Sequence, residues 1–114
     1  MSKPEPPPAC EGDPVTIKLI DWINQNQIPS KTKPSFGRKQ ASAAIKLIEE
    51  RDEYGFKKYG QHLMTKDGRN TIEDARQEFG DLLQYIYKAK LNGEDIEPIR
   101  ELFPVLKKLL FSTE

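Results

Sequence analysis

The sequence predicts an all-α protein, a bundle of about four helices. Apolar residues recur at spacings of three and four along several segments, and no segment alternates apolar and polar residues as a half-buried strand would. The nine prolines all lie outside the two longest periodic segments, as expected if those segments are helices. A length of 114 residues fits one domain with a thin core.

Composition excludes several classes of protein. The 18 basic and 18 acidic residues give a net charge of zero, which argues against a strongly basic nucleic-acid binder or an electrostatic membrane partner. No apolar run has membrane-spanning length, and the N-terminus lacks the apolar core of a secretory signal. We therefore expect a soluble, cytoplasmic protein. A single cysteine and a single histidine, Cys10 and His62, argue against a disulfide or a thiolate metal site.

The N-terminal part divides into a tail and a first helix. Residues 1–13 contain four prolines and are expected to form a disordered tail, so that the domain spans residues 14–114. A helix is predicted from about Pro14 to Gln25, with Asp13 as its N-cap.

The second helix is predicted from about Phe36 to Tyr59, capped by Ser35 and ended by a left-handed Gly60. It carries two apolar stripes on nearly opposite sides. A helix with two apolar faces lies centrally in a bundle or between subunits. One stripe is Ala41, Ala44, Ile45 and Ile48, and the other is Ala43, Leu47 and Tyr54.

A third helix is predicted from about Thr71 to Leu91, with a capping-box pattern at Asn70 and Glu73. A last helix spans about Ile96 to Phe111, where Pro104 must kink or split it. The apolar stripe of the third helix consists of Ile72, Ala75, Phe79, Leu82, Leu83, Ile86 and Ala89.

Two acidic pairs interrupt this apolar surface. Glu50 and Glu53 follow an aliphatic pair, and Glu78 and Asp81 are embedded among aromatic and aliphatic residues. The spacing of three places each pair on one side of its helix. If the second and third helices pack antiparallel, the pairs converge into four hard oxygen donors suited to Mg²⁺ or Mn²⁺. The count of acidic pairs matches chance, so a solvated acidic face is the alternative for each.

These segments resemble the MazG-like all-α nucleoside triphosphate pyrophosphohydrolases. The residues that carry the resemblance are Leu-Ile-Glu-Glu-Arg-Asp-Glu-Tyr at 47–54 and Glu-Phe-Gly-Asp-Leu-Leu at 78–83, which look like the family's ExxE and ExxD helices. The resemblance covers about residues 40–90. A phage-encoded, MazZ-like branch is more similar still, through Lys58-Tyr59-Gly60, Asp67-Gly68-Arg69, Asp74 and Tyr85. A phage origin would place the protein in the host cytoplasm.

The resemblance implies hydrolysis of a nucleoside triphosphate to a monophosphate and pyrophosphate. Its metal ligands would be Glu50, Glu53, Glu78 and Asp81, holding Mg²⁺ or Mn²⁺, with Glu53 as the base that deprotonates water. The alternative register, Glu49 and Asp52, lies closer to the inner apolar stripe. The family also forms dimers and tetramers, which fits the thin core, so we expect a homodimer or homotetramer.

Substrate contacts are expected around the loop between the two acidic helices. Lys58 and Arg69 flank this loop and are candidates for the phosphates, and Tyr59 and Tyr85 for stacking on the base. The resemblance to the phage-encoded branch also implies that Asp74 is a substrate-binding residue. That branch suggests dGTP or another purine deoxynucleotide, read by the amides of residues 24–27.

Three alternatives stay open. The chain is a non-catalytic assembly or adaptor module, a nucleotide-binding regulator without turnover, or a dUTP or dCTP pyrophosphatase of the same superfamily.

Overall fold

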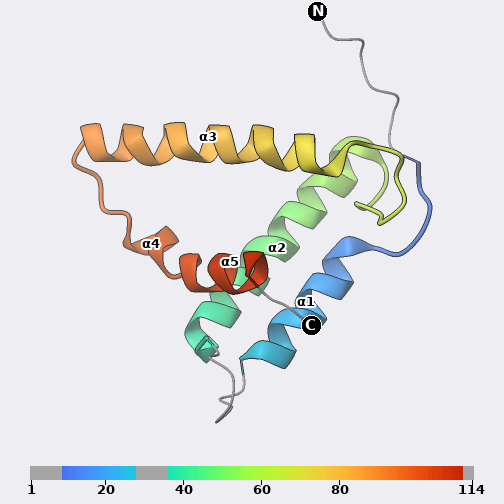
Figure 1. The fold of residues 1–114 in the computed structure, drawn as a ribbon, viewed down its shortest axis with the longest axis horizontal. Coiled ribbons are helices and arrows are strands. Elements are labelled where there is room, and N and C mark those ends of the chain that lie inside the picture. Colours follow the sequence, from blue (N-terminus) through green and yellow to red (C-terminus); the bar gives the residue numbers. More distant parts are fainter. Residues whose placement is uncertain (1–8, 28–35, 112–114) are drawn as a thin grey trace, which may run out of the picture.

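The computed structural model describes residues 9–27 and 36–111. Within these ranges the one strand-like feature is an isolated bridge between Pro14 and Met64, which confirms the all-α prediction there. No helix in these ranges has both the length and the apolar character needed to cross a membrane. The helices, shown in Figure 1, are α1 (Val15–Asn26), α2 (Arg38–Tyr59), α3 (Thr71–Leu91), α4 (Glu97–Arg100) and α5 (Phe103–Leu110).

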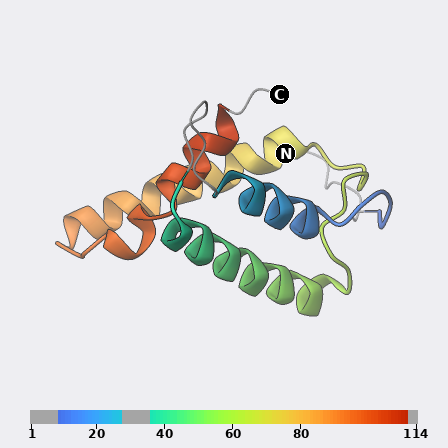
Figure 2. The ribbon, with the colours of Figure 1, turned by 90° about the horizontal axis from the view of Figure 1, so that it is seen from below.

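The core lies where α2 packs between α1 and α5. Figure 2 shows α1 running alongside α2. The inner stripe predicted for α2 does face this core, because Ala41 and Ala44 are buried and Ile45 and Ile48 pack against it. Ile23 of α1 is fully buried, which stabilises the fold by about 1.5–3 kcal/mol. The other buried members are Phe36, whose ring lies 6.0 Å from that of Trp22, and Val105 of α5.

The start of α1 differs from the prediction. Pro14, not Asp13, is the N-cap residue, and no side chain caps the helix. Asp13 cannot serve as the cap because its backbone is used elsewhere: its N–H donates to Thr65 Oγ1 (2.9 Å), and its carbonyl accepts from Thr65 N–H (2.8 Å).

Residues 9–14 form a segment that we call the N-terminal strap. The strap is hydrogen-bonded along the loop that follows α2, through Ala9 N–H to Asp67 O (2.8 Å) and Lys66 N–H to Glu11 O (3.0 Å). Val15 N–H extends this ladder by donating to Leu63 O (2.8 Å). Residues 9–13 of the predicted tail are therefore held on the domain, while residues 1–8 lie outside the described part.

Most other helix boundaries follow the prediction. Gly60 ends α2 in the left-handed region (φ 75°), and its N–H donates to Phe56 O. The Asn70 side chain caps α3 by accepting from Glu73 N–H (3.0 Å). The last predicted helix is split into α4 and α5, with Pro104 in the first turn of α5. For α2 the N-cap is Gly37; the predicted cap, Ser35, falls outside the described residues.

α3 stands apart from the rest of the chain. Figures 1 and 2 show α3 diverging from α2 beyond the loop that joins them, and α3 makes no extensive contact with another described helix. The expected packing of α2 against α3 is therefore absent within one chain. The physical reason is that the strap fixes the loop in a direction that carries α3 away from α2.

The strap gives a test of this arrangement. Gly12 has φ 84°, and a Cβ there would lie 2.9 Å from Lys66 N, so Gly12→Ala must strain or displace the ladder. We expect Gly12→Ala to lower the melting temperature. The matched control is Gly55→Ala, in a helix interior with open space around the new methyl group, which should raise stability by up to about 1 kcal/mol. Equal melting temperatures for wild type and Gly12→Ala would contradict a structural role for the strap.

Candidate functional site

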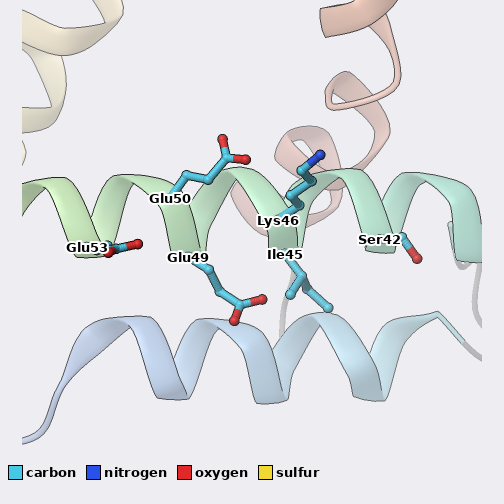
Figure 3. Close-up of a pocket in the computed structure, with 6 residues that line it drawn as sticks. All are labelled: Ser42, Ile45, Lys46, Glu49, Glu50 and Glu53. Atoms are coloured by element: carbon cyan, nitrogen blue, oxygen red, sulfur yellow. The ribbon is translucent and has the colours of Figure 1, made fainter.

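α2 presents the predicted carboxylates Glu50 and Glu53 on its exposed side. Figure 3 shows Glu50 projecting away from α1 and Glu49 projecting toward α1. Glu50 follows Ala44 by six residues and Ala41 by nine. These separations place Glu50 nearly half a turn around the helix axis from both buried alanines. An open groove of about 430 Å³ runs along this part of α2, lined by Ser42, Ile45, Lys46, Glu49, Glu50 and Glu53.

The two carboxylates differ in their partners. Glu53 Oε1 lies 3.1 Å from Lys57 Nζ, in an exposed pair of the kind that contributes little to stability. Glu50 makes no ion pair or side-chain hydrogen bond with any residue that the structure describes. Its carboxylate is therefore available to a ligand without breaking an existing contact.

Asp52, a member of the alternative register, is engaged in the fold. Its Oδ1 accepts from Thr16 Oγ1 of α1 (3.1 Å), and its carboxylate accepts from His62 Nδ1 (3.0 Å). The His62 ring in turn stacks on Phe56, with 4.5 Å between ring centroids. These contacts join α1, α2 and the loop after α2. The Asp52 carboxylate is therefore already used in holding these three segments together.

The sequence did not reveal this cluster around Asp52. Thr16, Asp52 and His62 are brought together only by tertiary folding, and their sequence spacing carries no helical or motif signal.

α3 carries the second predicted pair on one strip of its surface. Asp74, Glu78, Asp81 and Tyr85 follow one another at spacings of four, three and four residues, which places all four on one side of the helix. Glu78 and Asp81 are exposed and have no ion pair or hydrogen bond with the described residues.

The two acidic pairs are not brought together within one chain. Among residues 9–27 and 36–111, no three carboxylate, histidine or cysteine side chains form a group that could hold a metal ion. The expected four-carboxylate cluster is therefore incomplete in the single chain, because α3 does not pack on α2.

Arg69 and Asp74 meet at the start of α3. Arg69 donates from Nε to Asp74 Oδ2 (2.8 Å) and from Nη2 to Asp74 Oδ1 (2.9 Å), a bidentate pair. The hydrogen bonds from Arg69 lower the pKa of Asp74 below its ordinary value. Asp67, which is buried, accepts from Arg69 N–H (3.1 Å) and so shapes the turn that positions the guanidinium.

A group of cationic and aromatic side chains lies at the C-terminal end of α2. Lys58 Nζ is 5.2 Å from the centre of the Tyr59 ring, so these two predicted residues are neighbours. Sequence reasoning missed Tyr54, whose ring is contacted by Arg51 (4.5 Å) and Lys58 (6.0 Å). The spacings of three and four between Arg51, Tyr54 and Lys58 were the available signal. Tyr54, four residues after Glu50, lies on the same side of α2, whereas Tyr59, nine residues after Glu50, lies on the opposite side.

The amides proposed to read a guanine lie at the end of α1. Asn26 Nδ2 donates to Trp22 O (2.8 Å), and Gln27 Nε2 donates to Asn24 Oδ1 (2.9 Å). These side-chain amides therefore form hydrogen bonds with one another and with the backbone at the end of α1.

The structural role of Asp52 can be tested through stability. Asp52→Ala removes the acceptor for Thr16 and His62, so we expect a loss of about 1–2 kcal/mol in the free energy of unfolding. Glu49→Ala, one turn nearer the N-terminus, should change it by much less. Chemical denaturation of both variants measures the difference. Equal stabilities would show that the Asp52 cluster contributes nothing.

The ion pair between Arg69 and Asp74 predicts a pH dependence. Because its pKa is lower in the folded state than in the unfolded chain, Asp74 contributes stability above the unfolded value of about 3.9 and loses it as the pH falls through the lowered value. Wild type should therefore be more stable than Asp74→Asn at pH 7, with the difference vanishing in acid. Thermal unfolding at pH 7 and near pH 3 tests this, and a difference that grows in acid would contradict it.

Comparison of the chain with family models, with curated proteins and with solved structures finds no match.

Proposed function

We propose that the protein is a metal-dependent nucleoside triphosphate pyrophosphohydrolase of MazG-like type. The observation that carries this proposal is the exposed, unpartnered state of three of the four predicted ligands. Glu50, Glu78 and Asp81 are exposed and make no ion pair with any residue that the structure describes, so each is open to a metal ion without the loss of an existing contact. A purely solubilising acidic face does not need apolar neighbours.

The donor set fits the proposed metal in chemistry. Four carboxylates offer hard oxygen ligands, which suit Mg²⁺ or Mn²⁺, and each pair sits one helical turn apart. One pair alone is too few ligands, so the complete site needs both helices. When bound, the metal would neutralise the triphosphate and lower the pKa of a water molecule.

The remaining roles fall to residues of this chain. Glu53 is the proposed base that takes the proton of the attacking water, and it would exchange its contact with Lys57 for that role. Lys58 and Arg69 are proposed to contact the phosphates, and Asp74 fixes the plane of the Arg69 guanidinium. Tyr59 and Tyr85 are exposed and offer rings for stacking on a base.

The proposed substrate is dGTP or another purine deoxynucleoside triphosphate. A purine presents the larger stacking face, worth about 1–3 kcal/mol on a tyrosine ring. Guanine recognition by the amides of residues 24–27 would require their present hydrogen bonds to be replaced. The resemblance in the loop and in α3 supports the purine branch over dUTP or dCTP.

A non-catalytic assembly module is the second candidate. The observation that favours it is the apolar surface of α3, where Ile72, Phe79 and Leu83 are all more than half exposed. Stoichiometric Mn²⁺ binding separates the two functions, because a solvated acidic face would take up none. Nucleotide binding without pyrophosphate release would instead identify a regulator.

The test is pyrophosphate release from each canonical nucleotide with Mg²⁺ or Mn²⁺. We expect dGTP to be preferred. Glu50→Gln and Asp81→Asn should each reduce kcat/KM by at least about 100-fold, since even outer-shell partners of metal ligands cost 10–100-fold when removed. Both variants should keep the melting temperature of wild type or exceed it, because each removes a charge from an acidic site.

Glu49→Gln is the matched control and should retain most of the activity. Loss of activity in Glu49→Gln with activity retained in Glu50→Gln would contradict the proposed register. Equal kcat/KM for dGTP, dCTP and dUTP would refute purine selectivity.

A further inference from the structure

The C-terminal half of α2 carries an exposed tyrosine that is flanked along the helix by two cations. Tyr54 is 52% exposed, and Cζ of Arg51 lies 4.5 Å from the centre of its ring. Lys58 Nζ lies 6.0 Å from the same centre, one turn further along the helix. We call these three side chains the α2 cluster. Because cations at such distances are attracted to the face of an aromatic ring, the cluster has a defined arrangement before any ligand binds.

The two cations of the α2 cluster have no acidic partner. Neither Arg51 nor Lys58 makes an ion pair with a residue that the structure describes. Lys57, their neighbour in the sequence, is by contrast paired with Glu53 at 3.1 Å. An anion can therefore bind to the positive charge of the cluster without breaking an ion pair.

The α2 cluster lies beside the proposed metal ligand Glu50. Tyr54 follows Glu50 by four residues, so it lies on the same side of α2, about 6 Å further along the helix axis. Lys58 lies one more turn along, about 12 Å from Glu50. Figure 3 shows that Glu50 projects away from α1, so α1 does not cover this side of the helix. A ligand lying along α2 can thus contact Glu50 and the Tyr54 ring together.

A purine nucleoside triphosphate has the chemistry that this row of groups would recognise. Its base is flat and stacks on an exposed aromatic ring, and a purine covers more of that ring than a pyrimidine does. Its triphosphate is strongly negative, which complements Arg51, Lys58 and a metal ion at Glu50. A guanidinium that already stacks on an aromatic face also stacks on a base.

The other candidate rings are less well placed for this role. Tyr59 follows Glu50 by nine residues and therefore lies on the opposite side of α2. Tyr85 belongs to α3, which makes no extensive contact with α2. A base stacked on either of these rings would lie away from phosphates held at Glu50 of the same chain.

We propose that the purine base of the substrate stacks on Tyr54, and that Arg51 and Lys58 beside it attract the triphosphate. Tyr54 is then a specificity-determining residue, because the preference for a purine depends on its ring. The identity of the ligand as a nucleoside triphosphate rests on the proposed function. Its position rests on the α2 cluster and on the distance of that cluster from Glu50.

The test measures binding rather than turnover. Its probe is the α,β-methylene analogue of dGTP, which cannot release pyrophosphate, titrated calorimetrically in the presence of Mg²⁺. Tyr54→Ala should raise the Kd by at least about 5-fold, the lower end of what the stacking of one base contributes. Tyr54→Phe keeps the ring and should bind within about twofold of wild type.

Matched variants separate stacking from other effects. Tyr59→Ala removes an exposed tyrosine from the opposite side of α2, and Lys90→Gln removes an exposed cation from α3; both should leave the Kd unchanged. Arg51→Gln and Lys58→Gln should each raise it. In Tyr54→Ala, affinity for the corresponding dCTP analogue should fall less than affinity for the dGTP analogue. A merely structural role of Tyr54 would not change this ratio between the two bases.

Two results would overturn the inference. The first is an equal Kd for wild type and Tyr54→Ala; if the melting temperature of that variant falls while its Kd stays the same, the α2 cluster only stabilises the helix. The second is a larger loss of affinity in Tyr59→Ala than in Tyr54→Ala, which would assign the base to the other ring.

The outcomes also separate the inference from the proposed function. Analogue binding that depends on Tyr54, without pyrophosphate release from any nucleotide, would refute the hydrolase and support the stacking role. Pyrophosphate release with the same KM for dGTP in wild type and Tyr54→Ala would support the hydrolase and overturn the stacking role. A wild type that neither binds the analogue nor releases pyrophosphate would refute both.

Discussion

The direction of α3 depends on the hydrogen bonds between the N-terminal strap and the loop after α2. Those bonds fix residues 63–67 beside residues 9–15, and the cap at Asn70 then starts α3 at a defined angle. The exposure of the apolar stripe of α3 and the separation of its acidic pair from that of α2 follow from that angle.

Local features of the fold were predictable because they depend on neighbouring residues. The bounds of α3, its Asn70 cap, the left-handed Gly60 and the break at Pro104 follow from capping, glycine and proline chemistry at single positions. The inner face of α2 was predictable from the spacing of Ala41, Ala44 and Ile48. The role of Asp13 was not, because its backbone pairs with a residue far away in the sequence.

The candidate site was predictable in its parts and not in its assembly. Helical spacing predicted that Glu50 and Glu53, and likewise Glu78 and Asp81, share one side of their helix. Spacing within a helix carries no information about which helix it packs against, so the expected antiparallel contact of α2 and α3 was not found within the chain. For the same reason, the sequence did not predict the hydrogen bonds of Asp52 with Thr16 and His62.

The strap also has a consequence for the order of folding. It joins Asp13 to Thr65 across 52 positions, whereas most bonds within the helices span four. Closing so large a loop costs chain entropy that is recovered only when many of its contacts form together. We expect the strap to close with or after the pairing of α1 and α2, because that pairing brings residues 9–15 beside the end of α2.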